Sequence, residues 1–198
     1  MKLHSYRFLL AALVATCVAA SPSTASATPV VSLQPVSSTI AAGDPLTIAV
    51  QITGAVDLFA FQFDVLFDPL ALSATGPSTE GPFLATGGST FFIPGVEDNT
   101  TGAILGTANS LFGLSGVSGN GTLALLNFVG VPNASRSRTT ALTLANLLLL
   151  DSNLAPIAAT ELGANVTVNT VPEPATLLLL GSGLTFAWRR RGRGSRAL

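Results

Sequence analysis

Carboxylates are the only abundant side chains of the central segment that could act as acids, bases or metal ligands. Residues 28–170 contain nine aspartates and glutamates and two arginines, but no histidine, cysteine or lysine. Catalysis by a Ser–His pair, a Cys–His pair or a Schiff-base lysine is therefore excluded from this segment. The remaining catalytic option is a pair of carboxylates, as in glycoside hydrolysis.

Asp64 and Asp68, in "FQFDVLFDP", are the best candidates for such a pair. Their even spacing puts both on the same face of a β-strand, and that face is the one turned toward solvent. A catalytic pair also needs a cleft and a raised pKa, and nothing in the sequence points to either. We therefore predict no catalytic residues and no enzymatic activity.

Glu97, Asp98 and Asn99 form the candidate metal site, in the loop "VEDNTTG". Their hard oxygen atoms suit Ca²⁺, although their spacing differs from that of an EF-hand loop. The alternative is an Asx turn, in which Asp98 or Asn99 bonds to its own backbone. Apart from this calcium hypothesis, the sequence predicts no metal and no cofactor.

Phe91 and Phe92 are neighbours in "STFFIPG", so a strand turns their side chains to opposite faces. One of the two rings is expected on the surface, where an aromatic side chain can stack on a sugar ring. The alternative is a residue at the end of a sheet that a loop covers. The sequence does not otherwise point to ligand-binding residues.

The elements that position these residues are predicted to be β-strands. In "DLFAFQFDVLFDP" the apolar side chains occupy every second position from Phe59 to Phe67, and Pro69 then ends the strand. Turn-forming clusters of Gly, Pro, Asn and Asp separate the other apolar runs, which predicts an all-β sandwich or barrel. The alternation breaks near Asn146, which indicates a bulge or a strand buried on both faces. The other predicted strands are residues 30–34, 46–53, 89–93, 103–110, 122–130, 139–151 and 165–170.

Residues 1–27 have the features of a secretory signal peptide. A charged start precedes an apolar run, and the small residues Ala25 and Ala27 mark the cleavage site. The alternatives are an uncleaved N-terminal anchor and a lipoprotein attached through Cys17 in "VATC". Cleavage predicts export through the Sec pathway and leaves an acidic domain at residues 28–170. A domain with so few cations is a poor partner for nucleic acid and for anionic membrane surfaces.

The C-terminal segment, residues 171–198, combines a proline box, an apolar run and a basic end. Residues 175–188 would span about 21 Å as a helix, which is shorter than the roughly 30 Å hydrocarbon core of a membrane. The basic residues that follow are predicted to stay in the cytoplasm, so that the domain faces the periplasm. The defining residues are Val171, Pro172, Glu173 and Pro174 of the box and Arg189, Arg190 and Arg191 of the basic end.

The central segment resembles cohesin-like modules, which are bacterial extracellular jelly-roll sandwiches related to carbohydrate-binding domains. The likeness covers about residues 30–160 and includes "AGDPLTIAVQI", "FAFQFDVLFDPLAL" and "LTLANLLLLDSNLAPI" in that order. Its most specific parts are Phe67-Asp68-Pro69 with Leu72, followed by Gly119 to Leu123. The resemblance implies a jelly-roll or Ig-like β-sandwich, and cohesins usually bind dockerin modules.

The C-terminal segment resembles the PEP-CTERM sorting signal, because the Pro-Glu-Pro box, the apolar run and the arginine cluster occur in the same order. The resemblance implies an exosortase partner that cleaves near the box. It also implies a precursor held briefly in the inner membrane and a mature domain at the cell surface or outside the cell. It implies a bacterium that makes exopolysaccharide.

These observations predict three parts: a signal peptide at 1–27, a cohesin-like β-sandwich at 28–170 and a sorting signal at 171–198. We expect a non-enzymatic surface or matrix protein that binds polysaccharide or associates with exopolysaccharide. Two alternatives stay open. One is a structural matrix protein that assembles with copies of itself, and the other is an adaptor of the cohesin type that binds a protein module.

Overall fold

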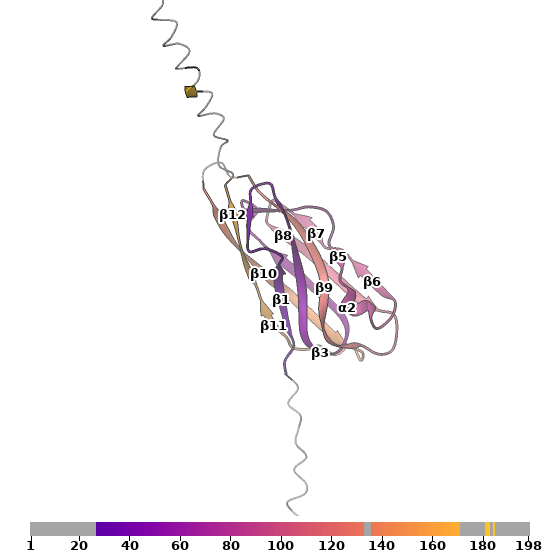
Figure 1. The fold of residues 1–198 in the computed structure, drawn as a ribbon. Coiled ribbons are helices and arrows are strands. Elements are labelled where there is room, and N and C mark those ends of the chain that lie inside the picture. The colour runs from indigo at the N-terminus through magenta and orange to yellow at the C-terminus, as the bar shows by residue number, and fades with distance from the viewer. Residues whose placement is uncertain (1–26, 133–135, 171–180, 183, 185–198) are drawn as a thin grey trace, which may run out of the picture.

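β3 (Pro45–Leu66) is the strand on which both layers of the fold are built. Its first half pairs with one set of strands and its second half with another, so that the strand passes from one sheet layer into the other. The passage occurs between Gly54 and Asp57, where both residues have positive φ angles of 73° and 56°. The computed structural model describes residues 27–132, 136–170, 181–182 and 184 (Figure 1).

The first layer surrounds the first half of β3. On one side, β1 (Val30–Pro35) pairs antiparallel with β3, and β11 (Thr160–Leu162) pairs parallel with β1. On the other side lies β9 (Val117–Gly130), which also pairs with the short strands β4 (Leu72–Ala74) and β5 (Thr79–Glu80).

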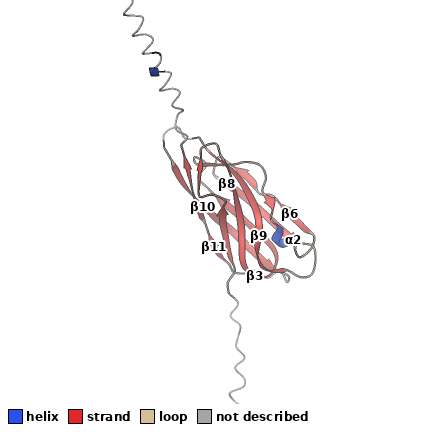
Figure 2. Cartoon of the chain, viewed as in Figure 1, coloured by secondary structure: helices blue, strands red, loops and turns tan. Residues whose placement is uncertain are grey.

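The second layer surrounds the second half of β3. On one side, β8 (Ala103–Leu111) pairs with β3 and with β6 (Thr90–Ile93) and β7 (Val96–Asp98). On the other side, β10 (Arg138–Asp151) leads to β12 (Ala164–Asn169) and then to β2 (Thr39–Ala41). Strands account for nearly all of the regular structure (Figure 2), and the short helix α2 (Pro82–Ala85) lies beside β9 and β8.

The core lies between the two layers and consists of the inward-facing side chains of both. Phe61, Phe63 and Val65 of β3 are buried, and the ring of Phe67 packs edge-on against Phe128 with their centroids 5.1 Å apart. All described strand pairings and the whole core cluster fall between Val30 and Asn169. Residues 28–170 therefore contain every described contact that holds the sandwich together.

The predicted all-β sandwich is confirmed, and so is the irregularity in the last long strand. Asn146 has a φ of 50°, and the register between β10 and β3 shifts between Ala145 and Leu148. The prediction of separate strands before and after Gly54 is wrong, because β9 keeps its ladder to β3 across the two irregular positions. Phe59 is half-buried instead of buried, since the backbone turn at Asp57 puts Leu58 on the inner face.

Five strands of two or three residues, β2, β4, β5, β7 and β11, lie where no strand is predicted. Each is too short to reveal a period of two in the sequence, and each owes its place to a longer neighbour with which it pairs.

Among the described residues, no helix has the length and apolar character needed to cross a membrane.

Candidate functional site

The outer face of the second layer carries an apolar pocket of about 190 Å³. The strand registers place two rows of outward-facing residues across four strands. The first row is Phe91, Ser110, Ala60 and Leu150, and the second is Ile93, Ala108, Gln62 and Leu148. The side chains of these eight residues, with Phe61 and Asn109 beneath them, line what we call the outer pocket.

The size of the side chains in each row explains why the surface is hollow. The two central strands present three small residues, Ala60, Ala108 and Ser110, together with Gln62, while the flanking strands β6 and β10 present Phe, Ile and Leu. The walls stand three strand spacings apart, which is roughly 14 Å. The result is a shallow apolar floor between two apolar walls.

The walls of the outer pocket are open to solvent. Phe91 is 56% exposed, Ile93 45% and Leu148 43%, and none of the lining side chains is charged. Large apolar side chains grouped on one face are typical of an interaction surface, whereas single exposed ones are ordinary. This face is therefore the candidate binding site.

An exposed apolar loop adjoins the outer pocket. The loop between β8 and β9 carries Phe112, which is 66% exposed, and Leu114, which is 97% exposed. The ring of Phe112 stands edge-on to that of Phe91, with their centroids 6.4 Å apart. Phe91 is thus the predicted surface aromatic, flanked by a loop residue but not covered by it, and Phe92 packs partly against the core.

Asp64 does not face solvent, so the prediction that it lies on the solvent-facing side of its strand is wrong. Its carboxylate is buried and accepts one hydrogen bond of 2.6 Å from the Gly106 backbone N–H and another of 2.6 Å from the Asn146 side chain. Gly106 and Asn146 both have positive φ angles, on the strands that flank β3. Asp64 therefore links the irregular positions of β8 and β10 and is a structural residue.

Asp68 lies beyond the end of β3 and is far less buried than Asp64. Its carboxylate accepts a hydrogen bond from the Leu70 N–H and forms an ion pair of 2.7 Å with Arg138. The Leu70 N–H, followed by Arg138, lowers the pKa of Asp68 below its ordinary value. Such a carboxylate stays ionised, which does not suit a general acid.

Glu97 lies on β7 opposite Ile104 of β8, and Asp98 and Asn99 use their side chains separately. Asp98 accepts hydrogen bonds from the Thr101 hydroxyl and from the backbone N–H groups of Thr100 and Thr101, so its pKa is lowered. Asn99 bonds to the backbone of a different strand, β4. The turn alternative is thus present, and in the described ranges no three His, Cys, Asp or Glu side chains lie close enough to hold a metal ion.

Asp57 is a structural residue that no pattern in the sequence reveals. Its Oδ2 accepts a hydrogen bond of 2.6 Å from the Ser152 hydroxyl, and its Oδ1 accepts one of 2.8 Å from the Gly116 N–H. These bonds lower its pKa, with the Ser152 hydroxyl as the largest cause. Asp57 thereby holds the β8–β9 loop, which carries Phe112 and Leu114, next to β3 and β10.

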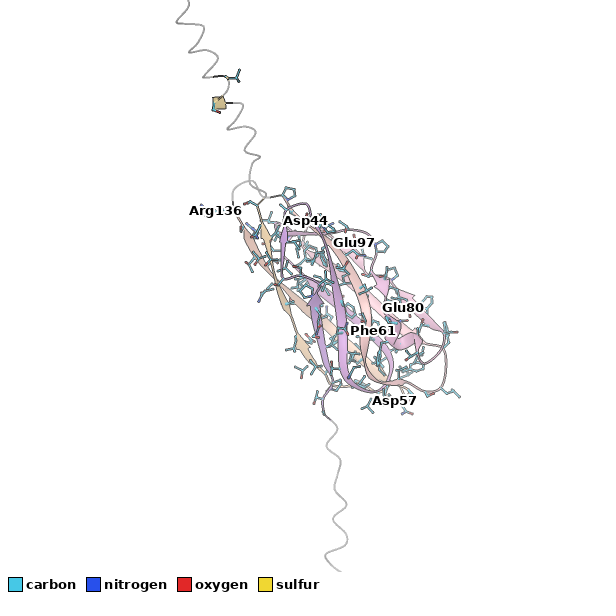
Figure 3. The ribbon with its side chains drawn as sticks, viewed as in Figure 1. Asp44, Asp57, Phe61, Glu80, Glu97 and Arg136 are labelled. Carbon is cyan, nitrogen blue, oxygen red and sulfur yellow. The ribbon has the colours of Figure 1, made fainter. Side chains whose placement is uncertain are left out.

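The outer pocket and the C-terminal exit lie toward opposite ends of the sandwich. β10 starts at Arg138, beside Val168 near the end of β12, and finishes at Asp151, beside Leu58. Fourteen residues of strand cover roughly 45 Å. Figure 3 shows Asp57 and Arg136 at these opposite ends, and the pocket residues Leu148 and Leu150 lie near the Asp57 end.

The predicted processing residues lie at the margins of the described chain. Ala27 is exposed and precedes β1, and Ala25 lies outside the described residues. The box and the basic end also lie outside them, that is, Val171, Pro172, Glu173, Pro174, Arg189, Arg190 and Arg191.

Residues 170–191 match the PEP-CTERM protein-sorting motif, which confirms the resemblance of the C-terminal segment. The motif indicates an exported protein that is anchored in a membrane during sorting, and it implies processing by an exosortase. No curated protein matches the chain by sequence.

Solved cohesin structures share the fold of the sandwich, which confirms the second resemblance. The second type II cohesin module of an adaptor scaffoldin from Acetivibrio cellulolyticus superimposes with a TM-score of 0.60 at 16% identity, over 74% of this chain and 99% of that one. A non-cellulosomal cohesin from the archaeon Archaeoglobus fulgidus gives 0.55 at 19% identity, over 76% and 96%. The cohesin of a type I cohesin–dockerin complex from Clostridium thermocellum gives 0.58 at 14% identity, over 73% and 95%.

Proposed function

We propose that this chain is an exported, non-enzymatic binding protein whose sandwich recognises another protein through the outer pocket. In this proposal residues 1–27 direct export through the Sec pathway and residues 171–198 tether the precursor in the inner membrane. The domain at 28–170 faces the periplasm until an exosortase cleaves near Pro172–Pro174. The mature domain then acts at the cell surface or in the extracellular matrix.

The observation that carries this proposal is the composition of the outer pocket. A mainly apolar hollow between apolar walls can accept apolar side chains of a protein partner, because such side chains gain free energy by leaving water. Sugar recognition relies on polar groups placed for hydrogen bonds, and Gln62 and Ser110 are the main polar side chains on this face. The cohesin of the solved Clostridium thermocellum complex binds a dockerin, which supports a protein module as the partner.

The position of the outer pocket supports the same proposal. The pocket lies toward the end of β10 away from β12, and β12 leads into the sorting segment. A domain tethered through its C-terminal end would therefore present the pocket away from the membrane. Binding and sorting then occupy different ends of the molecule.

Polysaccharide binding is the second candidate function, and one observation favours it. Phe91 and Phe112 form an exposed aromatic pair on the same face, and aromatic rings stack on sugar rings. Association with exopolysaccharide in a matrix would follow. The two candidates use the same face and differ in the occupant.

A photo-crosslinking amino acid at Ala108 identifies the occupant in producing cells. Ala108 lies on the floor of the outer pocket, whereas Ala141 is an exposed alanine on β10 outside the pocket and serves as the matched control. We expect a discrete adduct with one foreign protein from position 108 and no such adduct from position 141. The captured protein must then bind the purified domain, and the substitution Ala108→Trp must weaken that binding.

The other outcomes are equally informative. A broad carbohydrate-containing adduct that is lost in Phe91→Ala would support polysaccharide binding and contradict the protein partner. Equal adducts from positions 108 and 141 would contradict the outer pocket as the binding face. An adduct with a second copy of the chain alone would contradict a foreign protein partner.

A further inference from the structure

We propose that the outer pocket also binds a second copy of this chain, with Phe112 and Leu114 of each copy filling the pocket of the other. The resulting two-fold dimer covers the binding face and competes with any other occupant. This inference uses the same pocket as the proposed function, but it is tested through a loop that the proposed function does not require.

The loop that enters the pocket of the other copy is apolar and exposed to solvent. Leu114 is 97% exposed and Phe112 66%, which places both among the most exposed large apolar side chains of the described residues. A Cβ placed on Gly113, between them, would meet no heavy atom within 4 Å. The two side chains therefore project from the domain with free space around the residue that joins them.

The loop is held in place at both ends. The Phe112 N–H donates a hydrogen bond of 2.8 Å to the Ser89 carbonyl, and the Gly116 N–H donates one of 2.8 Å to Asp57 Oδ1. Asp57 is itself bound by the Ser152 hydroxyl at 2.6 Å. Fixing both ends in advance reduces the conformational entropy that the loop loses on binding.

The loop and the pocket lie next to each other on one face, and this arrangement is self-complementary. Phe112 contacts Phe91, which forms one wall of the pocket, so a projecting apolar loop adjoins an apolar hollow. A two-fold axis between two such faces places each loop over the other copy's pocket. Both contacts form at once, and the assembly closes as a dimer instead of growing into a fibre.

The size of the apolar surface predicts a weak dimer. Phe91, Ile93, Phe112, Leu114 and Leu148 together expose roughly 550 Å² of apolar surface, if a fully exposed large side chain is given about 180 Å². Stable interfaces bury about 800 Å² on each partner. We therefore expect dissociation constants in the micromolar range or weaker, so that the dimer forms where chains are concentrated, as on a cell surface.

The charge distribution gives the dimer a characteristic salt dependence. Residues 28–170 carry nine carboxylates against two arginines, so two copies repel each other, while none of the pocket side chains is charged. Salt screens this repulsion and strengthens apolar contacts. Raising the salt concentration should therefore tighten the dimer.

Sedimentation equilibrium tests the proposal on residues 28–170, which contain all described strand pairings, and on the full chain. The variants are Leu114→Asp in the loop and Val36→Asp as a control, because Val36 is 75% exposed and lies on the opposite layer beyond β1. We expect a salt-strengthened dimer that Leu114→Asp weakens by about tenfold or more and Val36→Asp leaves unchanged. A chain that stays monomeric up to about 1 mM, or a Leu114→Asp dimer as tight as the wild type, would overturn the proposal.

Disulfide trapping tests the geometry, because residues 28–170 contain no cysteine. Chains carrying Leu114→Cys are mixed with chains carrying Ala108→Cys, and the control mixture pairs Leu114→Cys with Ala141→Cys. A mixed disulfide in the first mixture alone is the expected result, and equal yields in both would contradict the loop-in-pocket arrangement.

Measuring how two variants affect both the dimer and the binding of a captured partner protein distinguishes this inference from the proposed function. Leu114→Asp should release the dimer and leave binding of a captured protein intact or stronger, whereas Ala108→Trp should abolish both. For Ala108→Trp, loss of partner binding with an intact dimer would refute the dimer alone, and loss of the dimer with intact partner binding would refute the proposed function alone.

Discussion

Asp64 shows how one buried carboxylate can organise three strands. It accepts hydrogen bonds from Gly106 on β8 and from Asn146 on β10, and both bonds are 2.6 Å long. The φ angles of Gly106 and Asn146 are positive, so their strands depart from regular pairing at these positions. A buried carboxylate is tolerated here because both of its oxygens have donors.

Replacing Asp64 by alanine should destabilise the domain by about 1–3 kcal/mol, because it leaves buried donors without an acceptor. Asp64→Asn is the control, since its amide oxygen can still accept one of the two hydrogen bonds and the loss should be smaller. Urea unfolding of the two variants and the wild type gives the free energies of unfolding. Equal stability of Asp64→Ala and the wild type would mean that Asp64 does not link the two strands.

Asp57 should make stability depend on pH. Its folded-state pKa lies below the ordinary value of 3.8, mainly because the Ser152 hydroxyl donates to it. A lowered pKa contributes stability above the unfolded-state pKa, and this contribution disappears as the pH falls through the folded-state pKa. We expect Asp57→Asn to lower the urea midpoint at pH 7 and to differ less from the wild type below about pH 4.

Urea titrations of wild type and Asp57→Asn at several pH values check this expectation. Asp44→Asn serves as a matched change of charge at the opposite end of the sandwich (Figure 3). A constant difference between wild type and Asp57→Asn from pH 7 to pH 3 would contradict the assigned hydrogen bonds.

Single residues also mark where sequence patterns stop being informative. The bulge at Asn146 is predictable because the alternation of leucines fails beside it. The burial of Asp64 is not predictable, since a period of two assigns it to the solvent face and only the partners on β8 and β10 cover it. Asp57 escapes detection for the same reason, because Ser152 and Gly116 come from loops far away in the sequence.

At the level of secondary-structure elements, β3 connects the two layers of the fold because it pairs with strands of both. A glycine and an aspartate with positive φ angles let one 22-residue strand serve both layers. The two halves of β3 are recognisable in the sequence as separate strands, but their continuity is not. A glycine within an apolar pattern signals a turn as readily as a kink, and the ladder to β9 decides between them.

Gly102 is the most tightly confined turn residue between β7 and β8. Its φ is 78°, and a Cβ at this position would press against the carbonyl oxygen of Phe67. Gly102→Ala should therefore cost about 1–3 kcal/mol for the backbone conformation alone, with the close contact adding to it. Gly43→Ala is the control, because Gly43 has a φ of 88° and a methyl group added there would meet no heavy atom within 4 Å.

Thermal or urea unfolding of both variants separates the two effects. We expect Gly102→Ala to be clearly less stable than Gly43→Ala. Equal losses would mean that the close approach of Gly102 to Phe67 is unimportant.

The strands β6 and β7 form an edge of the second layer that discourages pairing with strands of other molecules. β6 and β7 are four and three residues long, and Pro94 and Gly95 separate them. Short edge strands and an edge proline discourage the addition of further strands.

At the scale of the whole molecule, binding and sorting are assigned to different ends. The match to the PEP-CTERM motif covers residues 170–191, directly after the last strand, whereas the outer pocket lies near the other end of β10. The sorting signal is predictable from sequence because its parts are contiguous. The outer pocket is not, because its eight outward-facing residues come from four strands and their register becomes known only from the structure.

The basic end should determine the orientation of the precursor. Replacing Arg189, Arg190 and Arg191 by Glu removes the positive charges that we expect to hold this end in the cytoplasm, so membrane retention and processing should fail. Arg196→Glu is the control, because it lies outside the matched residues. Protease accessibility and the size of the released chain provide the measurement, and unchanged processing of the triple variant would contradict the orientation.

The most direct test of the central claim is the affinity of the captured partner for two tryptophan variants of the domain. Ala108→Trp fills the floor of the outer pocket, and Ala141→Trp adds the same side chain to an exposed position outside it. We expect Ala108→Trp to weaken binding by about tenfold or more in a calorimetric titration, while Ala141→Trp binds like the wild type. Equal affinity of Ala108→Trp and the wild type would show that the partner binds elsewhere.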